Sequence, residues 1–385
     1  MIQTCPPSFE EIVLADGIAA WRTTADGLAN WWTGALARKA TPPELAADWV
    51  RWWVAATQRR PPRWSSPNEV VLEAPIARLR DFSTARRSGV LPTLVLPPQA
   101  GHDSCIVDYA PEQSQMRTIL AAGLERAYAL DWIGATASTK DATIEDYLDV
   151  VDRAIEHTGG PVNLIGDCQG GWLATIYAAL RPELVNTLTI AGAPIDFHAG
   201  EPVIHAALRS LAPGGNLAFY RGLVDAGGGM LRGEHMLSGF IAIKPDNEIA
   251  RQMQLLANVD DAAHVARYRD FEDWFKHTQA IPGAFYLWIV EHLFRDNQLV
   301  AGTLEIGEQR VDLGRIECPL NLLAGAADHI TPPAQVFALA DHARTRADAI
   351  VRDVTPGGHL GLFMGREALS SHWPPLLDAV RAHSG

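Results

Sequence analysis

One cysteine stands in a pattern that favours nucleophilic chemistry. Cys168 lies at the centre of residues 166–170 (GDCQG), a G-x-C-x-G run between an apolar stretch and a predicted helix. The related G-x-S-x-G motif places a nucleophile on a strained strand-to-helix turn. Glycines on either side remove side chains that would collide at the bend, and the helix N-terminus favours the reactive thiolate. The motif therefore predicts acyl transfer through Cys168; the alternative is a buried cysteine in a glycine-rich turn.

Candidate partners for this nucleophile lie downstream, in the chain order that such enzymes use. Asp328 follows an apolar stretch at 320–323, and His359 lies in a glycine-rich run at 356–361 (PGGHLG). A histidine can take the thiol proton and later activate the acyl acceptor, while an aspartate holds its ring in one tautomer. We therefore assign His359 as the base and Asp328 as the orienting acid, with a purely structural role for His359 as the alternative. His329 is expected to be a surface or supporting residue.

An acyl-transfer site also needs backbone N–H donors for the oxyanion. The N–H of Gln169, directly after the nucleophile, is one candidate. The second should come from the loop after the strand predicted at 92–96, which begins with Pro97 and Pro98, residues without an N–H. We therefore expect the donor and the substrate contacts among the residues that follow: Gln99, Ala100, Gly101 and His102. For His102 the alternative is a hydrogen-bonding role within the loop.

A carboxylate adjoins the nucleophile. Asp167 would disfavour the Cys168 thiolate if its charge lay close to the sulfur. Neighbouring residues of an extended segment face opposite sides. We therefore expect a solvated or backbone-capping aspartate that points away from the site.

Strands and helices alternate from about residue 69 onward, which predicts a mostly parallel sheet with helices on both faces. Together with the cysteine motif, this indicates an α/β-hydrolase fold. The expected strands lie at 69–74, 92–96, up to 131, 162–165, 188–191, 320–323 and 350–354. The expected helices of this region lie at 116–123, 144–158 and 172–180.

Two segments fall outside this alternation. Residues 1–68 form a predicted helical extension, rich in tryptophan, before a catalytic domain at 69–385, and residues 196–300 form a predicted helical lid. The extension holds Trp21, Trp31, Trp32, Trp49, Trp52, Trp53 and Trp64. Trp49, Trp52 and Trp53 should share one helix face, which either packs on the catalytic domain or contacts a polymer or partner. The lid arginines Arg209, Arg221 and Arg232 are either solvated or meet coenzyme A phosphates.

Composition excludes several classes of protein. The 385 residues carry a formal net charge of −13, which argues against nucleic-acid binding. The N-terminus lacks a basic region followed by an apolar run, and no stretch reaches the roughly 18 apolar residues of a membrane-spanning helix. The four cysteines form no C-x-x-C pair, so we expect free thiols, no metal site and no cofactor. We expect a soluble, cytoplasmic protein.

Several stretches give the chain a resemblance to the polyhydroxyalkanoate synthases, especially the short subclass that works with a second subunit. They are ALDW (129–132), EDYL (145–148), NLIGDCQGG (163–171), APIDF (193–197), NQL (297–299), VDL (311–313), DHITPP (328–333) and GHLG (358–361). The resemblance runs from about residue 92 to the C-terminus and implies the same cysteine, aspartate and histidine as assigned above. Cysteine in place of serine is its most specific feature.

The resemblance implies a 3-hydroxyacyl-coenzyme A substrate, a covalent acyl-Cys168 intermediate and a growing polyhydroxyalkanoate chain. It also implies a second subunit or a homodimer, and association with polymer granules. Residues 100–102 (AGH) and 361–365 (GLFMG) look more like intracellular polyhydroxyalkanoate depolymerases, so hydrolysis of the polymer or of another ester by the same residues is the alternative. A catalytically inactive granule-binding protein, acting through its tryptophan-rich segment, is a third reading.

Overall fold

The computed structural model describes residues 9–86, 89–200, 202–243 and 246–385. The chain divides into two compact units. One consists of Met1–Pro62 and Met236–His277, and the other of Arg63–His235 and Thr278–Gly385. We call them the helical unit and the sheet unit, and each is described by itself.

An eight-stranded sheet forms the centre of the sheet unit, in the order β1-β2-β6-β3-β7-β8-β13-β14. The β1–β2 and β2–β6 pairs are antiparallel, and every later neighbour pair is parallel. The strands are β1 (Glu69–Ala74), β2 (Ala77–Asp81), β3 (Thr93–Leu96), β6 (Ala127–Trp132), β7 (Val162–Asp167), β8 (Val185–Ala191), β13 (Leu320–Gly325) and β14 (Ile350–Thr355). β3, β6, β7 and β13 are buried along their whole length, as expected for parallel strands covered on both faces.

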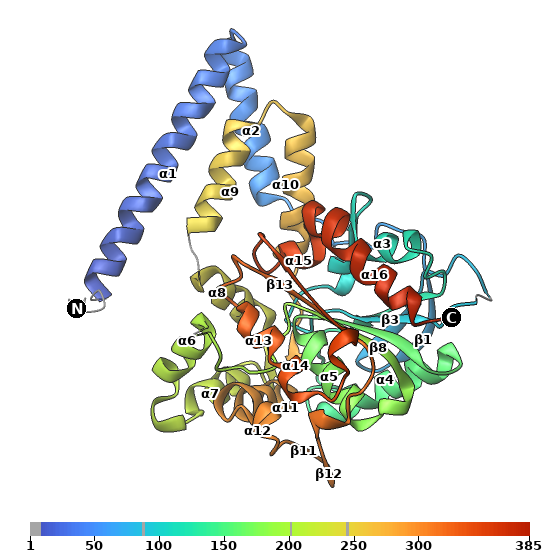
Figure 1. The fold of residues 1–385 in the computed structure, drawn as a ribbon. Coiled ribbons are helices and arrows are strands. Elements are labelled where there is room, and N and C mark those ends of the chain that lie inside the picture. Colours follow the sequence, from blue (N-terminus) through green and yellow to red (C-terminus); the bar gives the residue numbers. More distant parts are fainter. Residues whose placement is uncertain (1–8, 87–88, 201, 244–245) are drawn as a thin grey trace, which may run out of the picture. The chain divides into compact units, whose positions relative to one another are not determined.

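Helices cover both faces of this sheet (Figure 1). α3 (Gln115–Ala121) and α16 (Trp373–Ala382) pack together on one face, and α4 (Ile144–Thr158) and α5 (Gln169–Leu180) pack together on the other. The local sequence explains the limits of α4. Its first turn carries a capping box of Thr143 and Asp146, and Gly159 ends it in the left-handed conformation.

These observations confirm the predicted α/β-hydrolase fold. β1 and α4 have the predicted limits, and each other predicted strand and helix lies within a few residues of its place. β2 was missed, because its sequence ARLRD carries charged residues. Its Arg80 pairs with the buried Asp131 of β6, at 2.7 Å, so the neighbouring strand compensates that charge.

The helical unit contains α1 (Phe9–Ala37), α2 (Pro42–Thr57), α9 (Asp246–Ala257) and α10 (Ala262–Phe275). Trp31 of α1 packs with Leu256 and Val259, so the N-terminal helices share a core with a segment over two hundred residues downstream. The buried Glu272 forms ion pairs with basic groups from three segments: Arg59, Arg251 and Lys276, at 3.1–3.3 Å.

The tryptophans of the helical unit divide into buried and exposed sets. Trp31 is 5% exposed, and its indole N–H donates to the buried Asp48 at 3.2 Å. Trp21, Trp32, Trp49 and Trp53 are 41–73% exposed. The rings of Trp49 and Trp52 meet edge to face at 5.6 Å, which agrees with the predicted shared helix face.

The remaining elements are short. The α-helices and π-helices among them are α6 (Val203–Leu211), α7 (Ala218–Ala226), α8 (Gly233–Ile243), α11 (Gly283–Trp288), a π-helix at Ile289–Arg295, α12 (Gln298–Ala301), α13 (Pro333–Phe337), α14 (Leu339–His342), α15 (Gly361–Met364) and a π-helix at Ala368–His372. Two-residue or three-residue strands form the pairs β4 (Asp108–Ala110) with β5 (Gln113–Ser114), β9 (Met230–Leu231) with β10 (Ile281–Pro282), and β11 (Glu305–Ile306) with β12 (Gln309–Arg310).

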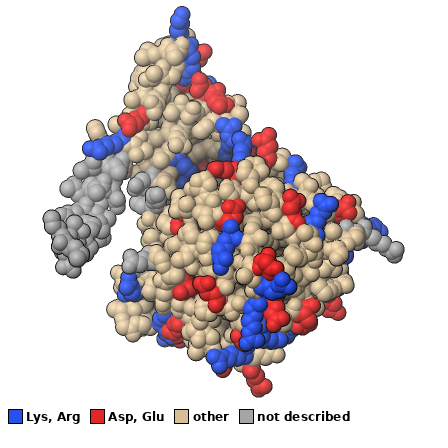
Figure 2. Space-filling model, in the orientation of Figure 1, with Lys and Arg blue, Asp and Glu red and all other residues tan. Residues whose placement is uncertain are grey.

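Charge is distributed without a dominant sign on the face shown in Figure 2. Basic and acidic side chains are mixed there. Among the described helices, none is both long and apolar enough to cross a bilayer.

Candidate active site

The turn between β7 and α5 holds Cys168 in a strained conformation. Its φ of 50° and ψ of −116° lie outside the regions that non-glycine residues usually adopt. The neighbouring glycines are required by close backbone packing. A Cβ at Gly166 would lie 2.5 Å from the Gly170 oxygen, and one at Gly170 would lie 1.9 Å from the Leu96 oxygen. The glycine spacing therefore has the steric cause that the sequence predicted.

His359 and Asp328 meet at the ends of two neighbouring strands. Asp328 follows β13 and His359 follows β14, and both side chains are buried. The His359 Nδ1–H donates to Asp328 Oδ2 at 2.7 Å. The other carboxylate oxygen, Oδ1, accepts from the backbone N–H groups of Ile330 and Thr331, each at 2.9 Å. These hydrogen bonds fix the orientation of the Asp328 side chain. Because Nδ1 of His359 is bonded to it, Nε2 is the ring nitrogen that can exchange a proton with the thiol.

Cys168 and His359 interact. Burial disfavours the charged imidazolium, but the Cys168 sulfur and the Asp328 carboxylate together raise the pKa of His359 to about 10. The Asp328 carboxylate accepts a hydrogen bond from the ring, and the Cys168 sulfur lies close enough to act on the charge of the ring. The structure therefore brings the three predicted residues together. Cys168 lies on the β7–α5 turn, which we call the elbow, Asp328 on the loop after β13, and His359 on the loop after β14. This arrangement can move a proton between sulfur and imidazole.

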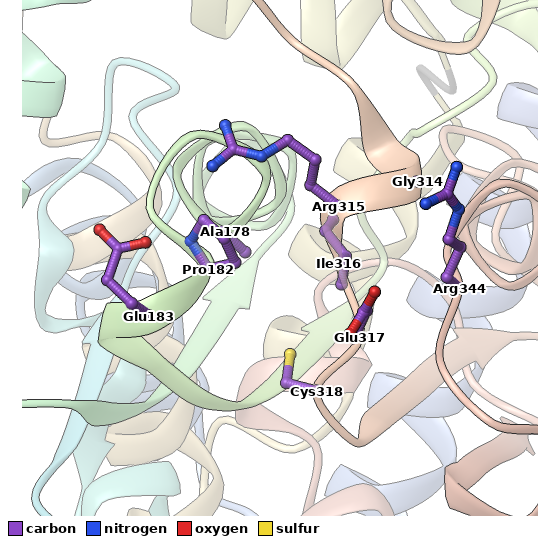
Figure 3. Close-up of a pocket in the computed structure, with 9 residues that line it drawn as sticks. All are labelled: Ala178, Pro182, Glu183, Gly314, Arg315, Ile316, Glu317, Cys318 and Arg344. Carbon is purple, nitrogen blue, oxygen red and sulfur yellow. The ribbon is translucent and has the colours of Figure 1, made fainter.

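The other described cysteines differ from Cys168. Burial raises the pKa of Cys318 to about 12 and raises that of Cys105 further. Cys318 lies just before β13, at the end of the sheet opposite Asp328, and lines a pocket of about 440 Å³ together with Arg315 and Arg344 (Figure 3). These thiols stay protonated. Cys318 is partly exposed like Cys168, so exposure alone does not distinguish the nucleophile. Cys5 lies outside the described residues.

The loop predicted to donate to the oxyanion passes directly beside the elbow. A Cβ at Gly170 would lie 2.8 Å from the Pro97 oxygen, in addition to its contact with Leu96. Beyond this point the loop is buried at Gln99, Ala100, Gly101 and His102. The Gln99 side-chain amide donates to the Tyr147 hydroxyl at 3.0 Å. The carbonyl of Gly101 accepts from the backbone of Gln279 at 2.8 Å, and His102 bridges to Thr278. Which backbone N–H groups serve an oxyanion stays a prediction, for Gln169 as for this loop.

The expectation for Asp167 was wrong. The side chain is fully buried rather than solvated, and its Oδ1 accepts from Gln115 Nε2 at 3.3 Å. The expectation failed because β7 lies between β3 and β8 in a sheet with helices on both faces. A side chain that points away from one face of such a strand meets the other helix layer and not water.

An aromatic group beside the elbow was not identified from the sequence. Tyr147 stacks on Phe285 with ring centroids 3.9 Å apart, and Trp172 lies 6.1 Å from Phe285 and 6.2 Å from Trp288. Among the described residues, the Trp172 indole N–H and the Gln169 side-chain oxygen are buried without a hydrogen-bond partner. The available signal was the aromatic pattern of residues 285–294, which identified helices but not their neighbours.

Two of the stretches that carry the family resemblance have a structural role. Asn297, in the left-handed conformation, accepts from the Phe197 backbone N–H at 2.9 Å and donates to Asp196 at 2.8 Å. Gln335 donates to the Phe197 carbonyl at 2.9 Å. These bonds hold the segment after β8 to the segments before α12 and in α13. Asp196 and Asn297 therefore fix loops and are not assigned to chemistry.

Comparison with known sequences identifies a family that this chain matches. Residues 76–369 match the family model described as "Protein of unknown function (DUF3141)". The chain belongs to the DUF3141 family. This match covers the β2–β14 region of the sheet and all of the predicted catalytic residues.

This DUF3141 protein also resembles poly(3-hydroxyalkanoate) polymerase subunits PhaC. It is 26% identical to that of Haloferax mediterranei over 331 residues, which are 83% of this chain but 65% of the relative. It is 26% identical to that of Allochromatium vinosum over 278 residues, 70% of this chain and 75% of the relative. The chain thus spans less than two thirds of the haloarchaeal subunit. A monoacylglycerol lipase of Paleococcus ferrophilus shares the fold, with a TM-score of 0.50 at 18% identity, covering 80% of this chain and 99% of that one.

Proposed function

We propose that this DUF3141 protein is a cysteine-dependent acyltransferase that polymerises 3-hydroxyacyl groups from coenzyme A thioesters. The observation that carries the proposal is the strained Cys168, which interacts electrostatically with a histidine that Asp328 orients. The similarity to PhaC subunits supports the substrate class.

The first half-reaction transfers an acyl group from one sulfur to another. His359 Nε2 takes the Cys168 thiol proton, and the sulfur attacks the thioester carbonyl. The oxyanion forms beside the N–H of Gln169, at the first turn of α5. When the C–S bond to coenzyme A breaks, the leaving thiolate takes the proton from His359. The products are acyl-Cys168 and free coenzyme A, so protons balance.

The second half-reaction regenerates the thiol. A hydroxyl of a further 3-hydroxyacyl unit gives its proton to His359 and attacks the acyl-Cys168 carbonyl. An ester bond forms, the carbon–sulfur bond breaks, and Cys168 recovers its proton from the imidazolium. Asp328 stabilises that imidazolium in both halves, because its carboxylate remains 2.7 Å from Nδ1. No metal or cofactor enters either step.

The wider proposal includes the architecture and setting of the enzyme. We take residues 1–68 as an extension to a catalytic domain at 69–385, with the insertion at about 196–300 as a lid. The protein would act in the cytoplasm at the surface of polymer granules, as a homodimer or with a second subunit.

Incubation with 3-hydroxybutyryl-coenzyme A tests the reaction. The proposal expects release of free coenzyme A together with a polymer that lengthens with time, and loss of both in Cys168→Ala. Release of free 3-hydroxybutyrate in amounts equal to the free coenzyme A, without polymer, would show that the enzyme catalyses hydrolysis and not synthesis. Full activity of Cys168→Ala would reject both reactions and leave a granule-binding role to be tested.

A further inference from the structure

A buried carboxyl group that forms no ion pair with any described residue lies next to the proposed nucleophile. Asp167 is the last residue of β7 and is fully buried. Its Oδ1 accepts one hydrogen bond, from Gln115 Nε2 in the first turn of α3. Among the described residues, neither the second oxygen of Asp167, Oδ2, nor the side-chain oxygen of Gln115, Oε1, has a hydrogen-bond partner.

Two buried acceptors in one carboxyl–amide pair need a donor. An ionised carboxylate can only accept hydrogen bonds, so it would leave both oxygens without a partner. A buried polar atom without a partner costs about 1–3 kcal/mol, and an uncompensated buried charge costs more. A single proton on Asp167 Oδ2 changes this, because the neutral acid can donate to Gln115 Oε1 while Gln115 Nε2 donates to Oδ1.

The surroundings of Asp167 favour the neutral acid. It pairs in register with the uncharged Ala191 of β8, and on the other side β7 ends against Leu96 of β3. Burial raises the pKa of Asp167 to about 8, although the Gln115 hydrogen bond and the charge of His359 both lower it. Among the described ionisable groups, His359 is the one whose charge acts on Asp167, and Cys168 adjoins it in the chain.

We infer that Asp167 and Gln115 form a reciprocal acid–amide pair in which the carboxyl group keeps its proton in the working enzyme. The pair leaves the strand end below the elbow neutral while Cys168 and His359 carry charge. Asp167 is therefore a positioning residue, and loss of its proton at alkaline pH switches off the site. This role rests on the proposed function, whereas the protonation of the pair does not.

Ionisation of Asp167 would act on both neighbours. A negative charge one residue from the sulfur disfavours the thiolate. The same negative charge stabilises the protonated ring of His359. The ring must lose this proton before it can take one from the next thiol or hydroxyl group. We therefore expect activity to fall as Asp167 loses its proton.

Infrared spectroscopy of protein labelled with ¹³C-aspartate tests the protonation directly. The wild type should show a protonated carboxyl band at pH 7 that disappears as the pH passes about 8, and Asp167→Asn should lack that band. Absence of the band in the wild type at pH 7, or its persistence in Asp167→Asn, would overturn the inference. The wild-type titration is informative even if the variant does not fold.

Two further measurements separate positioning from structure. Asn is a neutral replacement that keeps both hydrogen bonds, so Asp167→Asn should retain turnover at pH 7 and lose the several-fold decline above pH 8. Asp167 releases its proton from about pH 4 in the unfolded chain but only at about pH 8 in the folded wild type. The unfolding free energy of the wild type therefore falls as the pH rises from about 4 to about 8. The Tm of Asp167→Asn should therefore exceed that of the wild type by a margin that grows from pH 5 to pH 8.

The control is Asp131→Asn, which removes another buried carboxyl group near the end of a strand. Asp131 pairs with Arg80, so this variant should lower the Tm and keep the alkaline decline. An alkaline decline that is unchanged in Asp167→Asn would overturn the positioning role. Failure of the proposed function would show separately, as full turnover in Cys168→Ala. The infrared and Tm results do not depend on that outcome.

Discussion

The chemistry of this protein depends on which thiol is able to react. Three cysteines lie in the described part of the chain, and burial keeps Cys105 and Cys318 protonated. Cys168 differs through its strained backbone and its electrostatic interaction with His359. Reactivity therefore follows from position in the fold and not from residue type.

Alkylation should distinguish these thiols. Iodoacetamide at pH 7 should modify Cys168 at least about tenfold faster than Cys318, because the thiolate is the reactive form. Peptide mapping by mass spectrometry measures both rates in one sample. His359→Ala should remove most of the difference. Equal rates at the two positions would contradict the assignment of Cys168.

Asp328 should control the histidine. Asp328→Asn removes the negative charge beside Nδ1, so turnover should fall by about 10²–10⁴-fold. It should also lower the pKa of His359, which NMR of the ring protons would report. His329→Ala, which changes the next residue along the chain, should have little effect on either quantity. An unchanged His359 titration in Asp328→Asn would contradict the arrangement.

Stability should follow the same coupling. The pKa of His359 is raised from 6.5 to about 10, so its stabilising effect is complete below about pH 6.5 and is lost as the pH rises toward 10. The difference in unfolding free energy between the wild type and Asp328→Asn should therefore shrink over that interval. Urea unfolding at several pH values measures it. A difference that grows with pH would have the wrong sign.

At the scale of elements, close backbone packing constrains the β7–α5 turn of the sheet unit. Gly170→Ala would force a Cβ to within 1.9 Å of the Leu96 oxygen, so β3 and α5 would have to separate. We expect a loss of about 3 kcal/mol or more in unfolding free energy. Gly222→Ala is the matched control, because nothing lies within 4 Å of its Cβ. That variant should gain up to about 1 kcal/mol, and equal effects would contradict this steric account.

The sequence predicted this turn well because its signals are local. Alternating strands and helices and the glycine spacing each depend on residues close together in the chain. The contacts between distant segments were not predictable from the sequence. The burial of Asp167, the Tyr147–Phe285 stack and the Trp31–Leu256 contact need the packed structure, because no periodicity specifies which helix covers which side chain.

At the scale of the whole molecule, the helical unit is built from the N-terminal segment and one internal segment of the chain, Met236–His277. Trp31 should be essential to it: Trp31→Ala should cost about 3–5 kcal/mol, because a buried ring is lost. Trp53→Ala, at a 62% exposed position, should change stability by less than about 0.5 kcal/mol. Hydrogen exchange of α1, α2 and α9 measures both. Similar destabilisation by the two variants would contradict the described core.

The sheet unit carries every residue assigned to catalysis, so the central claim is a covalent one. Mass spectrometry after incubation with 3-hydroxybutyryl-coenzyme A should show a hydroxybutyryl group on the peptide that contains Cys168. That adduct should accumulate in His359→Ala, because this variant should still acylate Cys168 slowly and should transfer the acyl group onward more slowly still. The adduct should be absent in Cys168→Ala. The same turnover with no adduct on Cys168, or with the acyl group on another residue, would contradict the account.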